Sequence, residues 1–123
     1  MKIFVMLGAI NMALGVVLGA FGAHGLKQFA SPEQITVFQT GVQYQIYHAL
    51  GLLLVAVLLK QFPQAHGLRT GGWIMLAGII LFSGSLYLLG LTGNKIFGPV
   101  TPVGGVCFIV AWIWTFWAVL KEI

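Results

Sequence analysis

The stretch Gln39 to His48, QTGVQYQIYH, gathers three glutamines, two tyrosines and one histidine in a chain otherwise rich in Leu, Gly, Val and Ile. Amide and phenol groups donate and accept hydrogen bonds, and an imidazole can also bind a metal or relay a proton. The stretch leads directly into ALGLLLVAVLL, Ala49 to Leu59. The polar groups therefore enter an apolar environment, where they serve either packing or function.

The chain contains few side chains that could bind a metal. Its histidines and cysteines are His24, His48, His66 and Cys107, and no two of them are spaced along the chain as metal ligands usually are. A zinc site needs three or four ligands together. A haem or metal site through His24 and His48 would require a bend in the chain or ligands from two protomers, so we assign no metal and no cofactor.

Carboxylates are also scarce. Glu33 and Glu122 are the only acids, and neither lies in an apolar run. The chain therefore lacks a membrane-embedded carboxylate for ion-coupled transport or for a general acid–base pair. Nucleophile elbows, phosphate loops and metalloprotease motifs are absent as well. The sequence predicts that the protein is not an enzyme.

The elements that position these side chains are membrane helices. Hydrophobic residues make up 59% of the chain and charged residues 7%, with a mean hydropathy of +1.01, which excludes a water-soluble globule. Runs of about 20 apolar residues span a bilayer. Four such runs predict one all-α domain, residues 1–123, in which four transmembrane helices form a bundle: 3–23, 42–59, 72–91 and 103–120.

The second helix is expected to start before its membrane span. Ser31, Pro32 and Gln34 match an N-cap, a first helical position and a capping-box partner. Residues 32–41 would then lie at the interface or bend away from the span, and Gly41 offers a place for the bend. Residues 61–71 are expected to form a turn. Three tryptophans toward the end of the fourth helix are interpreted as interfacial anchors: Trp112, Trp114 and Trp117.

Lys and Arg in short connections favour the cytoplasmic side. With four spans, both termini and the middle connection share one side, which carries Lys2, Lys60, Arg69 and Lys121, whereas the other carries only Lys27 and Lys95. This bias predicts cytoplasmic N- and C-termini. The net charge of +4 suits anionic lipid headgroups in the bilayer and requires no nucleic acid.

On a helical wheel, the second helix carries a polar arc that we expect to face the other helices, because polar groups facing lipid are costly. Gln45 falls outside this arc and would need the interface or another protomer. The arc comprises Thr36, Gln39, Thr40, Gln43, Tyr44, Tyr47 and His48.

Estimated depths in the membrane place polar residues of other helices at about the level of His48. At 1.5 Å per residue, His48 lies about 18 Å from Lys60, Ser83 about 17 Å from Gly72 and Cys107 about 20 Å from Leu120. We therefore predict one buried polar layer of His48, Ser83, Cys107 and Asn11, with Tyr44 and Tyr47 nearby. Its roles remain open: interhelical hydrogen bonds that fix register, or a polar path or ligand pocket.

Small residues predict where helices approach closely. In the first helix, Gly8, Gly15, Gly19 and Gly22 share one face, and the spacing leaves open whether this seam meets the second helix or another protomer. The fourth helix has a comparable stripe, consisting of Gly104, Cys107, Ala111, Thr115 and Ala118.

Three motifs resemble a known family. GAFGAHGL at Gly19 to Leu26, FQTGVQYQIYHALGLLL at Phe38 to Leu54 and TPVGG at Thr101 to Gly105 are similar to domain of unknown function 423. This family is also called uncharacterised protein family 0382, and its eukaryotic relatives are called transmembrane protein 256. The resemblance covers essentially the whole chain and implies a four-helix protein of the bacterial plasma (inner) membrane. It implies no activity. Residues that match the family pattern are therefore candidates without assigned roles: Gly22, His24, Gly25, Gly41, Tyr44, Tyr47 and His48.

The sequence thus predicts a small multi-pass membrane protein that associates with itself or serves as a subunit of a larger membrane complex. The main alternative is a conduit or binding site for a small polar solute or ion, lined by the polar arc of the second helix. Haem or metal binding through His24 and His48 is the second alternative.

Overall fold

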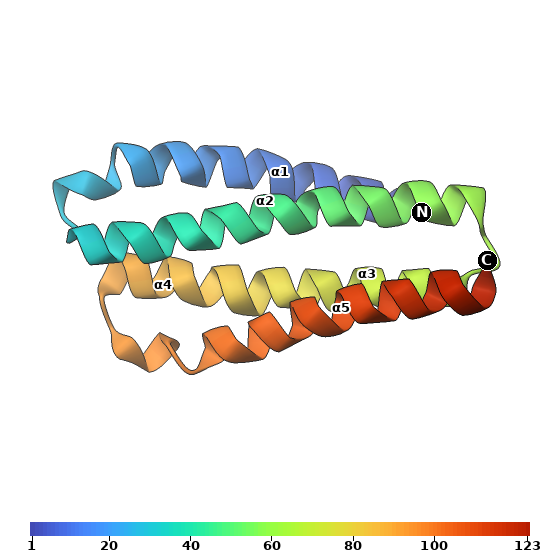
Figure 1. Cartoon of the computed structure of the whole chain (residues 1–123). Coiled ribbons are helices and arrows are strands. Elements are labelled where there is room, and N and C mark those ends of the chain that lie inside the picture. Colours follow the sequence, from blue (N-terminus) through green and yellow to red (C-terminus); the bar gives the residue numbers. More distant parts are fainter.

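The computed structural model describes residues 1–123 and is entirely helical (Figure 1). Four helical rods are long and apolar enough to cross a membrane, which confirms the predicted fold class. The third rod consists of α3 and α4 joined by a π turn at Ile79–Ser83. The α-helices are α1 Lys2–Ala23, α2 Pro32–Gln61, α3 His66–Gly78, α4 Gly84–Thr92 and α5 Val100–Glu122.

Both termini lie at the same end of the molecule, where α2 also turns into α3 (Figure 1). The opposite end carries two 3₁₀ turns, Leu26–Gln28 between α1 and α2 and Lys95–Phe97 between α4 and α5. Successive rods therefore run antiparallel, in the up-and-down order expected for short connections.

Helix boundaries differ most from the prediction at the start of α3. The helix begins at His66, so the expected turn over residues 61–71 is wrong and the connection is much shorter. The first turn of α3 is stabilised by a distant residue, because the Gly67 N–H donates to Glu122 Oε1 at 2.9 Å. A carboxylate at a helix N-terminus satisfies a free N–H and interacts favourably with the helix dipole.

The entry to α2 follows the prediction. Ser31 Oγ accepts from the Gln34 N–H, and Gln34 Oε1 accepts from the Ser31 N–H, which completes the capping box. The helix continues through Gly41 without interruption. At this glycine α2 approaches the third rod closely and does not bend, and the Ser83 hydroxyl donates to the Gly41 carbonyl at 2.7 Å. A Cβ at Gly41 would lie 3.0 Å from the Tyr87 ring.

The glycine seam of α1 packs against α2 of the same chain, which resolves the alternative that the spacing left open. A Cβ on Gly8 would lie 2.7 Å from Leu53, and one on Gly15 would lie 2.8 Å from Ile46. Gly19 and Gly22 face Val42 and Phe38 in the same way. Small residues thus allow α1 and α2 to pack closely along most of their length.

The four rods lie side by side in chain order, with α1 and α5 at opposite edges (Figure 1). On α5, the small-residue stripe contacts α3 and the π turn: Gly104 lies against the Phe82 backbone and Thr115 against Gly71. Gly104, Ala111, Thr115 and Ala118 are buried, whereas Cys107 is half-buried.

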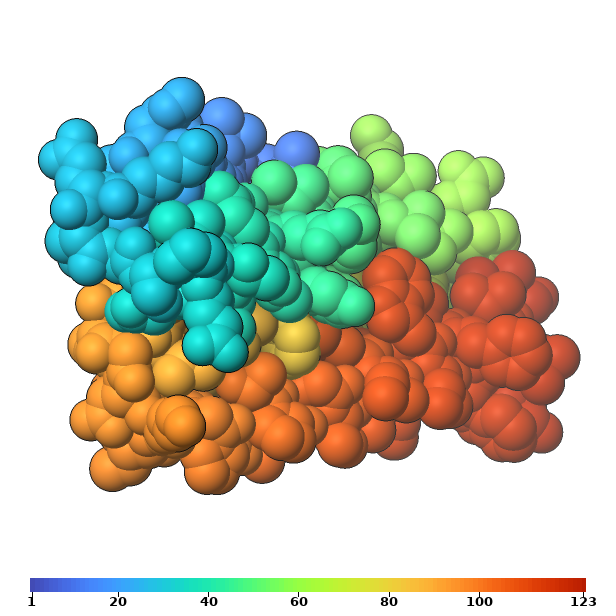
Figure 2. Space-filling view, turned by 60° about the vertical axis from the view of Figure 1, so that its left-hand side comes forward, coloured from blue at the N-terminus to red at the C-terminus, as the bar shows by residue number.

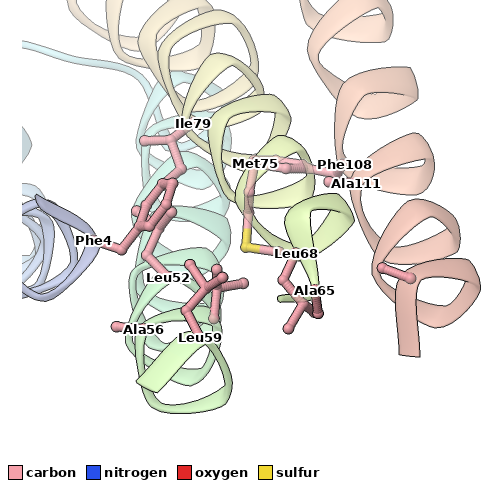
Figure 3. Close-up of a cluster of buried hydrophobic side chains, with 12 residues drawn as sticks. Phe4, Leu52, Ala56, Leu59, Ala65, Leu68, Met75, Ile79, Phe108 and Ala111 are labelled. Carbon is pink, nitrogen blue, oxygen red and sulfur yellow. The ribbon is translucent and has the colours of Figure 1, made fainter. Parts of the chain in front are cut away.

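The main apolar core lies toward the end that carries the termini. Phe4 reaches from α1 across to the third rod, where a Cβ on Gly72 would lie 2.7 Å from its ring. Figure 3 shows this ring beside Ile79. A smaller cluster at the other end contains Leu26, Phe38 and Val42. Between Val42 and Leu52 along α2 fall two buried polar residues, which are Gln45 and His48.

Candidate functional site

Gln45 is the centre of one buried hydrogen-bonded set that joins three helices. Its side chain is only 4% exposed. Gln45 Nε2 donates to Asn11 Oδ1 at 3.1 Å, and its Oε1 accepts from the Tyr87 hydroxyl. Asn11 Nδ2 donates in turn to the Leu7 carbonyl at 2.8 Å. The set therefore links α1, α2 and α4.

The prediction that Gln45 lies away from the other helices is consequently wrong. The helical wheel correctly placed Gln45 outside the polar arc, but that position on α2 faces α1 and α4 instead of the membrane interface or another protomer. Periodicity gives the relative angle of side chains on a helix and does not say which side meets a neighbour.

Much of the predicted polar arc faces outward, which corrects the expectation that it meets the other helices. Thr36, Gln43 and Tyr47 are exposed, and the Tyr47 side chain is 50% exposed. The Thr36 and Thr40 hydroxyls donate to the carbonyls of Pro32 and Thr36 in their own helix. Such local bonds reduce the cost of facing lipid. We call these outward residues the outer stripe: Thr36, Thr40, Gln43 and Tyr47.

Gln43 and Tyr47 pair within the outer stripe, because Gln43 Nε2 donates to Tyr47 Oη at 2.6 Å. Gln39 belongs to the arc but faces inward, where its Nε2 donates to the Gly19 carbonyl of α1 at 3.3 Å. The arc therefore does not line an interior path, and the conduit alternative has no support from this geometry.

His48 is 5% exposed, and both of its ring nitrogens are engaged. Nδ1 lies 2.8 Å from the Tyr44 carbonyl, and Trp112 Nε1 donates to Nε2 at 3.0 Å. A carbonyl only accepts and an indole N–H only donates, so the proton resides on Nδ1 and the ring is neutral. The imidazole also stacks on Phe108, with ring centroids 3.6 Å apart.

Trp112, which the sequence predicts to be an interfacial anchor, also has a specific internal partner, because its indole N–H donates to His48. Trp114 and Trp117 remain exposed on α5. Lys121 Nζ lies 4.9 Å from the Trp117 ring centre, a cation–π contact near the end of the helix. That contact suits an interfacial position.

The predicted polar layer is divided into separate sets. Ser83 bonds to Gly41, Asn11 to Gln45, and His48 to Trp112, with no hydrogen bond from one set to another. The Tyr44 ring lies beside His48, with centroids 6.2 Å apart. Cys107 takes part in none of these bonds. The depth estimates therefore gave the level of each residue along its helix, but they could not show which side chains contact one another.

His24 lies apart from all of these sets. It is exposed at the C-cap of α1, where its backbone N–H bonds to the Ala20 carbonyl. No group of three or more His, Cys, Asp or Glu residues is placed to hold a metal ion. The haem or metal alternative through His24 and His48 is therefore unsupported.

A cavity of about 400 Å³ lies between α2 and α5. Figure 2 looks onto this face, with α2 in teal and green above α5 in orange, and gold atoms of the third rod between them. We call this cavity the aromatic groove. It is lined by Tyr44, His48, Phe82, Gly105, Phe108, Ile109 and Trp112.

Among these residues, the sequence singled out Tyr44 and His48 as site candidates and Trp112 as an interfacial anchor, and the other four were missed. A usable signal was present on α5, because Gly105, Phe108, Ile109 and Trp112 follow helical spacing and share one face. The contribution of Phe82 had no such signal, since it depends on the π turn. A second, smaller cavity of about 230 Å³ lies beside Gln34 and Lys95, at the end of the molecule that carries the two 3₁₀ turns.

Comparison with known proteins agrees with this architecture. Residues 18–105 match the family model described as protein of unknown function DUF423. The UPF0382 membrane protein YwdK of Bacillus subtilis is 52% identical over 121 residues, which cover 98% of each chain. UPF0382 membrane proteins of Staphylococcus aureus and Staphylococcus epidermidis are 45% and 42% identical over the same proportions.

No solved structure matches the chain. The family match extends over more than half of the sequence, and the relatives align almost from end to end. The four apolar rods and the relatives' description as membrane proteins also agree. The chain therefore belongs to the DUF423 family of membrane proteins, whose molecular function is described as unknown.

Proposed function

We propose that the chain is a non-catalytic protein of the bacterial plasma membrane that works as an assembly of identical copies. The outer stripe of α2 forms the contact between copies. One observation carries this proposal: Gln43 and Tyr47 face outward, whereas Asn11, Gln45, His48 and Ser83 are bonded inside.

The depth of the outer stripe supports the need for a partner. Tyr47 lies about 20 Å and Gln43 about 26 Å along the helix from Lys60. Both distances fall within a hydrocarbon core of about 30 Å. After their mutual bond, Gln43 retains a carbonyl oxygen and one N–H, and Tyr47 retains its O–H. Covering these groups with protein avoids leaving them in lipid.

A second copy is the occupant that fits this chemistry. Gln43 and Tyr47 each carry both a donor and an acceptor, so the pair can bond to its own image across a two-fold axis. Such an isologous contact is the commonest way in which identical subunits associate. The glycine seam of α1 is already filled by α2, so that face of α1 is not available for association with a second copy.

The test is the mass of the full chain in nanodiscs, measured by native mass spectrometry. The expected species is a dimer of the 13.3 kDa chain. The double variant Gln43→Leu with Tyr47→Phe should weaken dimerisation by roughly tenfold, because it removes the hydrogen bonds across the interface. Gln61→Leu is the matched control, since Gln61 is exposed at the end of the same helix.

A monomeric wild-type chain, or a dimer unaffected by the double variant, would overturn the proposal. A complex with a different protein would instead show that the chain is an accessory subunit. The control should retain the wild-type mass distribution, which separates loss of the stripe from a general effect of replacing glutamine by leucine.

A further inference from the structure

The aromatic groove presents aromatic surface from two sides. Tyr44 contributes from α2 and Trp112 from α5, and their side chains are 37% and 39% exposed. Phe82 and Phe108 lie between them, with ring centroids 5.4 Å apart. A cavity of about 400 Å³ has the size of a small-molecule site.

Two adjacent glycines of α5 indicate that the groove is not required for packing. A Cβ at Gly104 would collide with the Phe82 backbone, so a glycine is needed there for helix contact. A Cβ at Gly105 would approach the Phe82 ring no closer than 3.8 Å. Gly105 therefore leaves room that the protein's own packing does not use.

The polar groups of the groove define the ligand. None of the seven lining residues carries a formal charge, because the bonding of His48 keeps its ring neutral. The His48 nitrogens and the Trp112 N–H are already engaged. The Tyr44 hydroxyl has no partner within the chain and remains free to donate one hydrogen bond.

Depth indicates the source of the ligand. His48 lies about 18 Å from Lys60 along α2, within the hydrocarbon core of the bilayer. The groove opens on the side of the molecule between α2 and α5 (Figure 2). A molecule dissolved in the membrane can therefore reach it without crossing water.

We propose that the aromatic groove binds an uncharged, flat ring compound of the quinone class. The ring packs against the aromatic side chains, a carbonyl oxygen accepts from the Tyr44 hydroxyl, and an apolar tail extends into lipid. This proposal concerns binding only and does not rest on the association of copies through the outer stripe.

The experiment measures retention of a 1,4-naphthoquinone with a prenyl tail by the full chain in nanodiscs, against empty nanodiscs of the same lipid. Gly105→Leu places a side chain in the groove and should weaken binding at least tenfold. Gly84→Leu is the matched control, because a Cβ at Gly84 meets nothing within 4 Å and Gly84 does not line the groove. This control should bind as the wild type does.

Tyr44→Phe tests the hydrogen bond separately, and we expect about threefold weaker binding, as for one interhelical hydrogen bond in a membrane. Thermal unfolding establishes that each variant is folded. Retention equal to that of empty nanodiscs, or unchanged by Gly105→Leu, would overturn the proposal. Equal competition by a prenyl alcohol that has the tail and no ring would overturn the assignment to a ring compound.

Discussion

Two glutamines on one turn of α2 have opposite environments. Gln45 is buried and bonded to Asn11 and Tyr87, whereas Gln43 faces outward and bonds only to Tyr47 of its own helix. The same amide chemistry therefore links three helices at one position, and at the other position it belongs to the surface through which we propose that copies associate.

Gln45→Leu should destabilise the chain by about 1 kcal/mol, because it leaves Asn11 and Tyr87 without their partner. A double-mutant cycle with Asn11→Ala should give a coupling free energy of about 0.6 to 1.7 kcal/mol. The measurement is reversible unfolding in mixed micelles. Gln61→Leu, at an exposed position of the same helix, is the control. Additive effects in the cycle would contradict the hydrogen bond between Gln45 and Asn11.

Trp112→Phe should cost about 1 kcal/mol, because it leaves His48 Nε2 buried without its donor. The same unfolding measurement applies, and Trp114→Phe on the exposed side of α5 should change little. In addition, nitrogen NMR of the wild type should place the His48 proton on Nδ1. A proton on Nε2 would be inconsistent with the Trp112 contact.

At the scale of elements, composition and apolar run length predicted the four helices because only helices and closed barrels satisfy the backbone in lipid. The Ser31 capping box predicted the start of α2. The outward direction of Gln43 and Tyr47 could not be predicted, since it depends on which side α1 and α4 occupy. The π turn at Ile79–Ser83 likewise had no sequence signal, and it contributes Phe82 to the aromatic groove.

The contact between α5 and the π turn leads to a paired prediction for adjacent glycines. Gly104→Ala should destabilise the chain by about 1 to 3 kcal/mol, because the new methyl group collides with the Phe82 backbone. Gly105→Ala should be neutral or stabilising by up to about 1 kcal/mol, since alanine favours helix and has room there. Equal effects in thermal unfolding would contradict this packing.

At the scale of the whole molecule, both termini share one end (Figure 1). The predicted cytoplasmic orientation of that end remains a proposal. In a Cys107→Ser background, Gln28→Cys and Gln61→Cys place single thiols at exposed positions at opposite ends. An impermeant maleimide applied to intact cells should label position 28, and position 61 only after permeabilisation. The reverse pattern would invert the orientation.

The bond between Glu122 and Gly67 also has a consequence for the order of assembly. These residues are 55 positions apart, and a ribosome supplies the earlier one first. The Gly67 N–H in the first turn of α3 therefore lacks this carboxylate partner until α5 has been synthesised and inserted. The α1–α2 hairpin, whose glycine seam is contained within residues 1–61, needs no such later residue. We expect it to form first, and the arrival of α5 to complete the fold.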